Sequence, residues 1–294
     1  MVRSMKCLVC ESEEIRTFYP PEQGYAVVRC QTCGLVFHPP QEAVKRIEEV
    51  YKREYYFSDD AAFGYENYIA EKDNIQKTFS KRVEVIKRFA PAGHLLDVGC
   101  ALGYFLEMAH RAGYAVKGID VSPWASQYAK EHYRFEVIAG TLEECTAFPE
   151  GFFDIITLWD VMEQLPHPKL FIHKVSSLLK KGGYVFLTMR DIDSIVSRVL
   201  KRKWIHFRPR EKFVYFNGRS IRRLLEDENL AVEFTTYHGM GKDCTLRTLI
   251  HKLSHYGRWL AAPLDRVCSL LRLQEASVYL NFYDSQLIAA RKMS

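Results

Sequence analysis

The stretch that most constrains the fold is residues 94–105, HLLDVGCALGYF. An apolar run ends at Asp97, a turn spaced Gly-x-Ala-x-Gly follows over residues 99–103, and the next residues have helical spacing. A short apolar run that stops at glycines and leads into a helix is typical of the first βα unit of a doubly wound sheet. Such a turn lets the backbone approach a ligand closely, and the helix N-terminus offers unpaired N–H groups to an anionic group.

The ligand expected at this turn is not a dinucleotide, because the turn lacks the G-x-G-x-x-G spacing. Asp97 stands just before the turn, where a carboxylate can meet a positively charged group. The next apolar run, residues 114–119, ends at Asp120, about where a ribose-binding carboxylate lies in a βαβ unit. A carboxylate for an ammonium group, N–H groups for a carboxylate and Asp120 for a ribose diol together suit S-adenosylmethionine.

The residues 97–105, DVGCALGYF, with 118–122, GIDVS, resemble the cofactor core of class I S-adenosylmethionine-dependent methyltransferases. The middle glycine usual in that family is Ala101 here. The resemblance implies an α/β fold with a doubly wound, mostly parallel seven-stranded sheet. It also implies cofactor-binding roles for residues near the strand ends: Asp97, Gly99, Cys100, Ala101, Gly103, Tyr104, Phe105, Asp120, Val121, Thr141, Leu142 and Trp159.

The remaining pattern fits the same fold. Ser122 and Pro123 predict the N-cap and first turn of a helix. Further elements are predicted as helix 69–89, strand 135–139, buried strand 152–160, a helix ended by Gly182 and Gly183, strand 184–189, and last strands 230–237 and 278–291. The final pair is expected to include an antiparallel strand, which is typical of this methyltransferase sheet.

A metal site is predicted near the N-terminus. Cys7 and Cys10 form one C-x-x-C pair, and Cys30 and Cys33 form a second at the spacing of a four-cysteine zinc site. Four thiolates leave no open coordination position, so the zinc is expected to be structural. Such zinc ribbons occur both as nucleic-acid-binding modules and as elements that only stabilise a fold, and the sequence does not distinguish between these roles.

Candidate catalytic residues follow the buried strand, in residues 160–168, DVMEQLPHP. This stretch again resembles the methyltransferase family, which commonly has Glu-His where this chain has Glu163 and Gln164. An oxygen nucleophile of high pKa needs a general base. The candidates by position are Asp160 as a cofactor-side or acceptor-side carboxylate, His167 as base, and Glu163, with His206 and Glu211 as further candidates.

Two tracts have more than one interpretation. The aromatic tract, residues 51–68, either packs the ribbon on the main domain or forms a lid over the cleft. With the two C-x-x-C pairs, it resembles a subset of bacterial methyltransferases with an N-terminal zinc-binding segment, some of which act on sugars or on polysaccharide and antibiotic precursors. The basic segment 197–223 is either a solvated helix face with a loop or an anion-binding rim. Its residues 204–216 resemble the family's substrate-side insertion, with Lys212 where histidine is usual.

The helical insert 246–273 is amphipathic and basic. Core packing or a dimer surface is the first interpretation, and peripheral membrane contact is the alternative. The predicted organisation is a zinc ribbon over 1–40, an aromatic-rich helical linker or lid over 41–93, and an S-adenosylmethionine-binding domain over 94–294, with insertions at about 190–217 and 240–275.

The expected function is methyl transfer from S-adenosylmethionine to a small molecule, namely a sugar, a glycan or a lipid-linked precursor. The alternatives are an RNA methyltransferase and a non-catalytic cofactor-binding scaffold. The formal net charge of +5 is mild. No apolar run reaches membrane-spanning length and the N-terminus has no apolar signal core, so we expect a cytoplasmic location.

Overall fold

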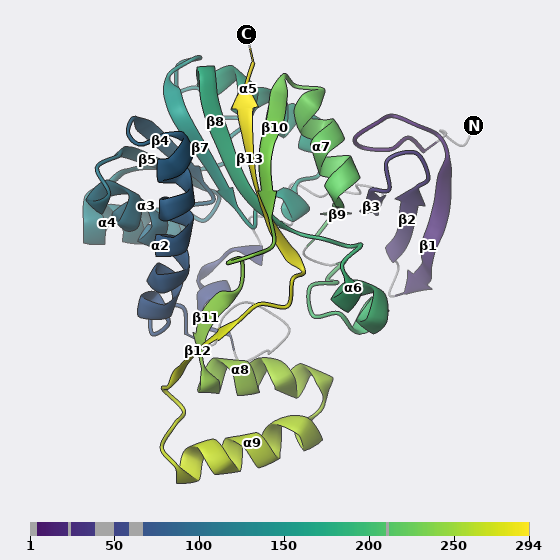
Figure 1. Ribbon diagram of the computed structural model, residues 1–294, viewed down its shortest axis with the longest axis vertical. Coiled ribbons are helices and arrows are strands. Elements are labelled where there is room, and N and C mark those ends of the chain that lie inside the picture. The colour runs from purple at the N-terminus through teal and green to yellow at the C-terminus, as the bar shows by residue number, and fades with distance from the viewer. Residues whose placement is uncertain (1–4, 23–24, 39–49, 59–66, 210–211, 294) are drawn as a thin grey trace.

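The structure is a computed structural model that describes residues 5–22, 25–38, 50–58, 67–209 and 212–293. Its centre is a seven-stranded sheet in the order β10-β13-β8-β7-β4-β5-β6 (Figure 1). The strands are β4 (His94–Val98), β5 (Ala115–Asp120), β6 (Glu136–Ala139), β7 (Phe153–Trp159), β8 (Leu179–Arg190), β10 (Leu230–Thr236) and β13 (Ser285–Lys292). Strands β4 to β8 run parallel, and β13 is antiparallel to both of its neighbours. The predicted α/β fold and its antiparallel strand are confirmed.

Helices cover both faces of this sheet because its strands are apolar on both sides. Leu95 and Ile155 pack with α2 (Lys72–Phe89) and α3 (Tyr104–Arg111) in one cluster. Their neighbours Leu96 and Ile156 point the other way and pack with α5 (Pro168–Leu178) and α7 (Gly218–Glu226). The α4 helix (Pro123–Tyr133) begins as predicted, with the Ser122 side chain accepting from the Ala125 N–H.

One predicted helix end is wrong. The α5 helix stops at Leu178, and Gly182 and Gly183 lie inside β8 instead of capping the helix. The ammonium group of Lys292 donates to the carbonyl oxygens of Ser176 and Leu179 at 2.6 and 2.9 Å, so a side chain of β13 satisfies the helix end. Gly183 is needed for close strand approach, since a Cβ there would lie 3.0 Å from the Asp154 carbonyl oxygen.

A second correction concerns residues 278–281, which do not belong to the central sheet. Strand β12 (Ser277–Leu280) pairs with β11 (Lys242–Thr245) in a separate two-stranded sheet. Its side chains alternate between exposed and half-buried, whereas a central strand of this fold is buried on both faces. The helices between β11 and β12 are α8 (Leu246–Leu253) and α9 (Arg258–Leu270).

The N-terminal segment forms a four-stranded sheet in the order β1-β2-β3-β9. Strands β1 (Ile15–Glu22), β2 (Tyr25–Cys30) and β3 (Val36–Phe37) are consecutive, while β9 (Val214–Tyr215) comes from far along the chain (Figure 1). Residues 41–49 and 59–66 of the predicted helical linker or lid lie outside the described residues. Among the residues that are described, no helix is both long and apolar enough to cross a bilayer.

Candidate cofactor and acceptor site

A cavity of about 830 Å³ lies at the carboxyl ends of β4, β5 and β7 and extends to β11 and α8. Most of the predicted cofactor-binding residues line it: Asp97, Gly99, Cys100, Ala101, Asp120, Val121, Thr141, Leu142 and Trp159. Gly103, Tyr104 and Phe105 do not line it. Gly103 instead sets the start of α3, and the rings of Tyr104 and Phe105 pack behind the turn.

The turn between β4 and α3 has three residues in the left-handed region, Gly99 at φ 76°, Ala101 at φ 47° and Gly103 at φ 83°. Only Ala101 carries a Cβ, and a non-glycine residue in this region costs about 1 kcal/mol. The turn directs the Ala101 N–H to Asp120 Oδ2 at 2.7 Å, and the Ser122 N–H donates to Oδ1 at 2.8 Å. Burial raises the pKa of Asp120 to about 6, and these two hydrogen bonds oppose the rise. Asp120 is therefore ionised at pH 7 and held in place by backbone.

Asp97 is buried at the carboxyl end of β4, with 1% of its surface exposed. Its Oδ1 accepts a hydrogen bond from Thr157 Oγ1 at 2.6 Å, and no group among the described residues donates to Oδ2. Burial raises the pKa of Asp97 to about 8, against the opposing effects of Thr157 and Arg82. A buried carboxylate that lines a cavity with one oxygen unpartnered fits a cationic group of a ligand.

Asp160 lies across the cavity, in the left-handed region at φ 58° just after β7. Thr188 Oγ1 donates to its Oδ1 at 3.0 Å, and the Lys242 ammonium group lies 3.0 Å from Oδ2. Burial acts to raise the pKa of Asp160, but the charges of Lys242, Arg190 and Arg82 together hold it well below its ordinary value. Asp160 is consequently a fixed anion and a poor proton acceptor at neutral pH.

The carboxylate of Glu163 does not reach the cavity, so the structure gives no support to the predicted catalytic role. Glu163 has 0% of its surface exposed and does not line the cavity. Its Oε1 accepts the Arg190 N–H at 2.7 Å and lies 3.7 Å from the Lys212 ammonium group. Glu163 therefore lies behind the cavity wall and contacts two basic residues that line the cavity, Arg190 and Lys212.

The two candidate histidines occupy different ends of the cavity. His167 precedes α5 and lies near Glu143, whose burial-raised pKa it partly lowers. His206 lies beside Asp284, with Nε2 3.9 Å from Asp284 Oδ2. Burial, together with the charges of Arg190 and other basic residues, holds the pKa of His206 well below its ordinary value. His206 is therefore neutral at pH 7. Glu211 lies outside the described residues.

Sequence reasoning singled out Trp204 as part of the substrate-side insertion, but missed Arg82, Arg190, Lys242 and Asp284 at this second end of the cavity. Arg190 ends β8, and its guanidinium lies 3.2 Å from Asp284 Oδ1. The Trp204 indole N–H donates to Asp284 Oδ2 at 2.9 Å. Arg82 from α2 and Lys242 from β11 also line the cavity. Ligands bind at the carboxyl ends of parallel strands, and this rule could have identified Arg190 at the end of β8. It does not apply to Asp284, which lies just before the start of β13.

Four tyrosines in the described part of the aromatic tract lie at the cavity. Tyr51, Tyr55, Tyr56 and Tyr68 line the cavity. Tyr68 stacks on Tyr104 with ring centroids 5.4 Å apart, which places Tyr104 one layer behind. This arrangement agrees with the lid interpretation; Phe63 and Tyr65 lie outside the described residues.

Comparison of the sequence with models of protein families shows which family the chain belongs to. The family model described as "Methyltransferase domain" matches residues 71–233, which is more than half of the chain. The chain belongs to this methyltransferase family. Two curated relatives are both "Ubiquinone biosynthesis O-methyltransferase", from Xanthomonas axonopodis pv. citri (34% identical) and Ralstonia nicotianae (36% identical). Each match covers 114 residues, 36% of this chain and 48% of the relative, so the methyltransferase spans about half the length of these relatives.

Solved structures agree on the fold. A chain from the complex between the Haloferax volcanii Trm112 methyltransferase activator and a putative methyltransferase matches with a TM-score of 0.53 and 13% identity, over 76% of this methyltransferase and 94% of that chain. A putative methyltransferase from Bacillus halodurans matches with a TM-score of 0.51 and 15% identity, over 73% and 99%. At these identities the likeness concerns the fold alone.

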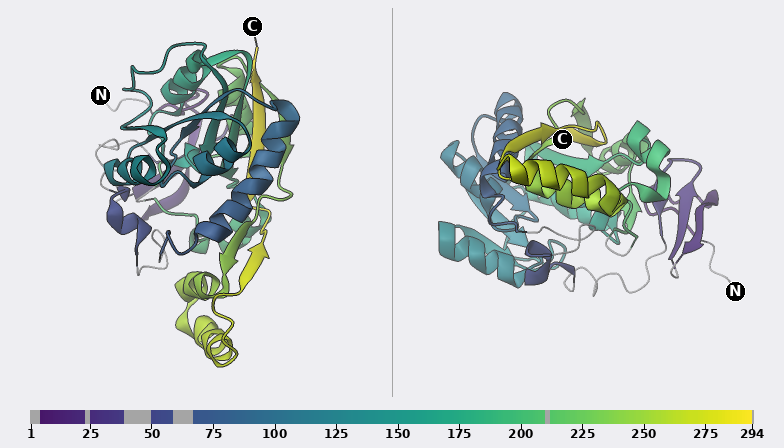
Figure 2. Two further views of the ribbon diagram at one scale, coloured as in Figure 1. Left: turned by 90° about the vertical axis from the view of Figure 1, so that its left-hand side faces the viewer. Right: turned by 90° about the horizontal axis from the view of Figure 1, so that it is seen from below.

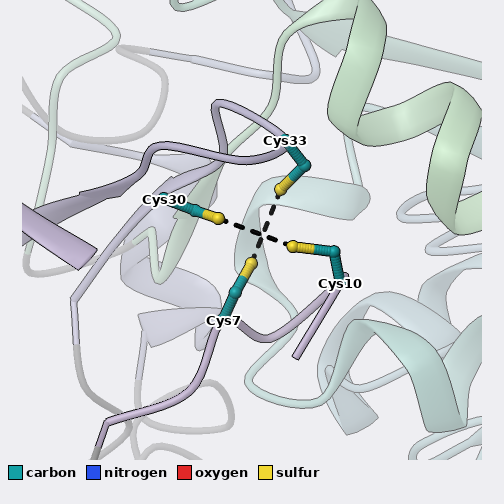
Figure 3. A group of neighbouring side chains, drawn as sticks. All are labelled: Cys7, Cys10, Cys30 and Cys33. Carbon is teal, nitrogen blue, oxygen red and sulfur yellow. Dashed lines mark hydrogen bonds between the residues drawn. The ribbon is translucent and has the colours of Figure 1, made fainter. Parts of the chain in front are cut away.

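The methyltransferase also carries the predicted cysteine cluster. The sulfur atoms of Cys7, Cys10, Cys30 and Cys33 all lie within 4.8 Å of one another and converge on one point (Figure 3). The Cys7–Cys33 and Cys10–Cys30 sulfur pairs are each 3.5 Å apart. A tetrahedral zinc site with Zn–S distances of about 2.3 Å separates its sulfurs by roughly 3.8 Å. The geometry is therefore compatible with the predicted structural zinc.

The cysteine cluster is tied to the wall of the methyltransferase that carries His206 and Lys212. Arg29, one residue before Cys30, binds both carboxylate oxygens of Asp193 at 2.9 and 2.8 Å. Asn217 donates to the same Asp193 at 2.8 Å and caps α7. His38 hydrogen-bonds the Lys212 carbonyl oxygen at 2.7 Å. The N-terminal sheet thus supports the segment that lines this end of the cavity.

Proposed function

We propose that this methyltransferase transfers the methyl group of S-adenosylmethionine to a hydroxyl of a small acidic acceptor. The observation that carries the proposal is the pair of buried carboxylates, Asp97 and Asp120, at neighbouring strand ends of one cavity. The unpartnered oxygen of Asp97 suits the ammonium group of the cofactor. Asp120 suits the ribose diol, and Thr141 and Leu142 line the place expected for adenine. The bound cofactor supplies an electrophilic methyl group on a sulfonium.

The basic wall supports an acidic acceptor. Arg190, Arg208, Lys212 and Lys242 line this end of the cavity, and all four charges lower the pKa of His206. The anions at the same end are Asp160 and Asp284, together with Glu163, which lies behind the cavity wall beside Lys212. Asp243 also lines the cavity, but its charge is matched by Lys81. A cationic surplus in a partly closed cavity favours a phosphate or carboxylate group on the acceptor. The relatives' name supports transfer to oxygen. A sugar, glycan or lipid-linked precursor remains the proposed acceptor class.

His206 is proposed as the group that removes the hydroxyl proton. It is neutral at pH 7 and lines the cavity, so its ring is available to accept a proton. The surrounding basic side chains weaken it as a base, whereas Asp284 beside it and an anionic acceptor would stabilise the imidazolium as it forms. Arg190 and Trp204 hold Asp284 in place. Methyl transfer is an in-line displacement, so the remaining contribution of the chain is to hold the hydroxyl aligned with the methyl group in a closed cavity.

The first experiment is a calorimetric titration of the full chain with S-adenosylmethionine. We expect a Kd near 1 μM (about −8 kcal/mol), strong weakening in Asp120→Ala and no change in Asp265→Ala, an exposed carboxylate on α9. Labelled-methyl transfer is then measured with phosphorylated sugars, lipid-linked sugar phosphates, hydroxylated aromatic acids and RNA. Absence of cofactor binding to folded protein overturns the proposal, and turnover on RNA alone overturns the acceptor class.

A further inference from the structure

The α8–α9 pair forms an arm at one end of the molecule. Figure 1 shows α9 as the outermost element, at the end of the long axis opposite the C-terminus, and Figure 2 shows it foremost when the molecule is seen from below. Of α9, Ala261 is buried and Cys268 is half-buried. These two residues lie on the same side of the helix, so one side of α9 packs and the other faces outward.

The outward side of α9 is apolar. Its large side chains are exposed: the exposed fraction is 37% for Leu260, 75% for Trp259 and 84% for Leu270. At 100° per residue they fill one continuous arc of the helix: Trp259, Leu260, Pro263, Leu264, Val267, Leu270 and Leu271. An exposed apolar arc of this width in a water-soluble helix marks an interaction surface.

The charged residues around the apolar arc indicate which kind of surface it would bind. The arm, residues 246–276, contains five basic residues and two acidic ones. Arg258, Arg266 and Arg272 are exposed on or just beyond α9, and Arg266 lies next to the edge of the apolar arc by its helical position. An apolar face bordered by arginines is complementary to a bilayer with anionic head groups, which takes up both the apolar side chains and the positive charge.

The opposite side of the arm belongs to the cavity. Leu249, Lys252 and Leu253 of α8 line it, as does Phe282, which follows β12. One pair of helices therefore presents an apolar, basic surface outward and an apolar wall inward. A surface bound through α9 would lie against the cavity end that α8 closes.

We propose that the α9 face docks this protein on an anionic phospholipid surface. The proposal does not depend on the methyl-transfer reaction, since docking is measured without cofactor or acceptor. In this proposal α9 does not cross the bilayer. It lies parallel to the membrane surface, with its apolar arc inserted at the level of the head groups.

The test is sedimentation of the full chain with vesicles of phosphatidylcholine alone, or with about a third phosphatidylglycerol. We expect binding to the anionic vesicles and much weaker binding to the neutral ones. Val267→Glu with Leu270→Glu should abolish binding. Arg266→Gln with Arg272→Gln should weaken it about fivefold for each charge removed. The control is Met293→Glu, which changes an apolar residue about as exposed as Val267, near the C-terminus at the other end of the molecule. This variant should bind like the wild type.

Trp259 provides a second readout, because it is the most exposed tryptophan among the four in the chain. Its emission should shift to shorter wavelength with anionic vesicles, and the shift should vanish in Trp259→Phe while sedimentation persists. Equal binding to neutral and anionic vesicles overturns the electrostatic part of the proposal. No vesicle binding overturns it entirely. In that case a concentration-dependent dimer that the Val267→Glu, Leu270→Glu variant dissociates would assign the face to a second copy of the chain.

Discussion

Asp97 should make the affinity for S-adenosylmethionine depend on pH, and its burial gives the direction. Burial raises the pKa of Asp97 to about 8 in the cofactor-free protein. An ammonium group beside the unpartnered Oδ2 favours the ionised carboxylate, so binding at pH 7 releases the proton. The affinity therefore rises as the pH approaches 8 and levels off above it.

The magnitude follows from the same pKa. With a pKa of about 8, roughly nine in ten Asp97 side chains are protonated at pH 7. The affinity should rise about eightfold between pH 6.5 and 7.5, or about 1.2 kcal/mol. Asp120, with a pKa of about 6, adds less than about a factor of two over this range.

The assay is calorimetry at both pH values, repeated at pH 7 in buffers of low and high ionisation enthalpy to count the released proton. Thr157→Val removes the hydrogen bond that lowers the pKa of Asp97, so the rise in affinity should move to higher pH. Asp97→Asn should bind weakly and with little pH dependence. Equal wild-type affinity at pH 6.5 and 7.5, with no proton released, would refute the reasoning.

Three further predictions concern stability and rate. Ala101→Gly should raise the free energy of unfolding by roughly 0.5–1 kcal/mol in urea titrations, because glycine relieves the left-handed φ of 47°; a decrease would contradict the assigned backbone conformation. His206→Gln should lower kcat by about 10²–10⁴ while leaving cofactor affinity intact. Because its pKa is held well below the ordinary value, His206 should cause no loss of wild-type rate between pH 8 and 6. Cys30→Ser should lower the thermal midpoint and raise the acceptor KM more than the cofactor Kd, whereas Cys268→Ser should change neither; equal effects of both substitutions would argue against a metal site.

The cofactor half of the cavity could be predicted because its residues lie at strand ends within one short stretch of chain. Asp97 and Asp120 each follow an apolar run and stand on neighbouring parallel strands, so sequence order alone brings them together. The turn between them is local, and its glycines mark it directly.

The acceptor half could not be predicted in the same way, because its residues come from segments far apart in the chain. Lys242, His206 and Asp284 meet only after β11, the basic segment and β13 have packed on the sheet. The catalytic role of Glu163 stays a prediction, and it shows that position along the chain does not say which way a side chain points. Its carboxylate turns inward to the Arg190 backbone instead of into the cavity. The role of His167 remains a prediction, as does the division of the chain at residues 40 and 93.

The pairing of β3 with β9 has a consequence for biosynthesis. Val36 pairs with Tyr215, about 180 residues further along the chain, and contacts of such separation form late and slowly. The four cysteines therefore leave the ribosome long before their sheet can be completed, and until then Val36 and Phe37 present an open apolar edge that invites pairing with other chains. A metal ion bound early by the hairpin would hold this edge in a defined shape while synthesis continues. Truncation of the first 38 residues removes β3 and leaves Val214 and Tyr215 of β9 without a partner strand, so it should yield an aggregating chain and not a smaller, active domain.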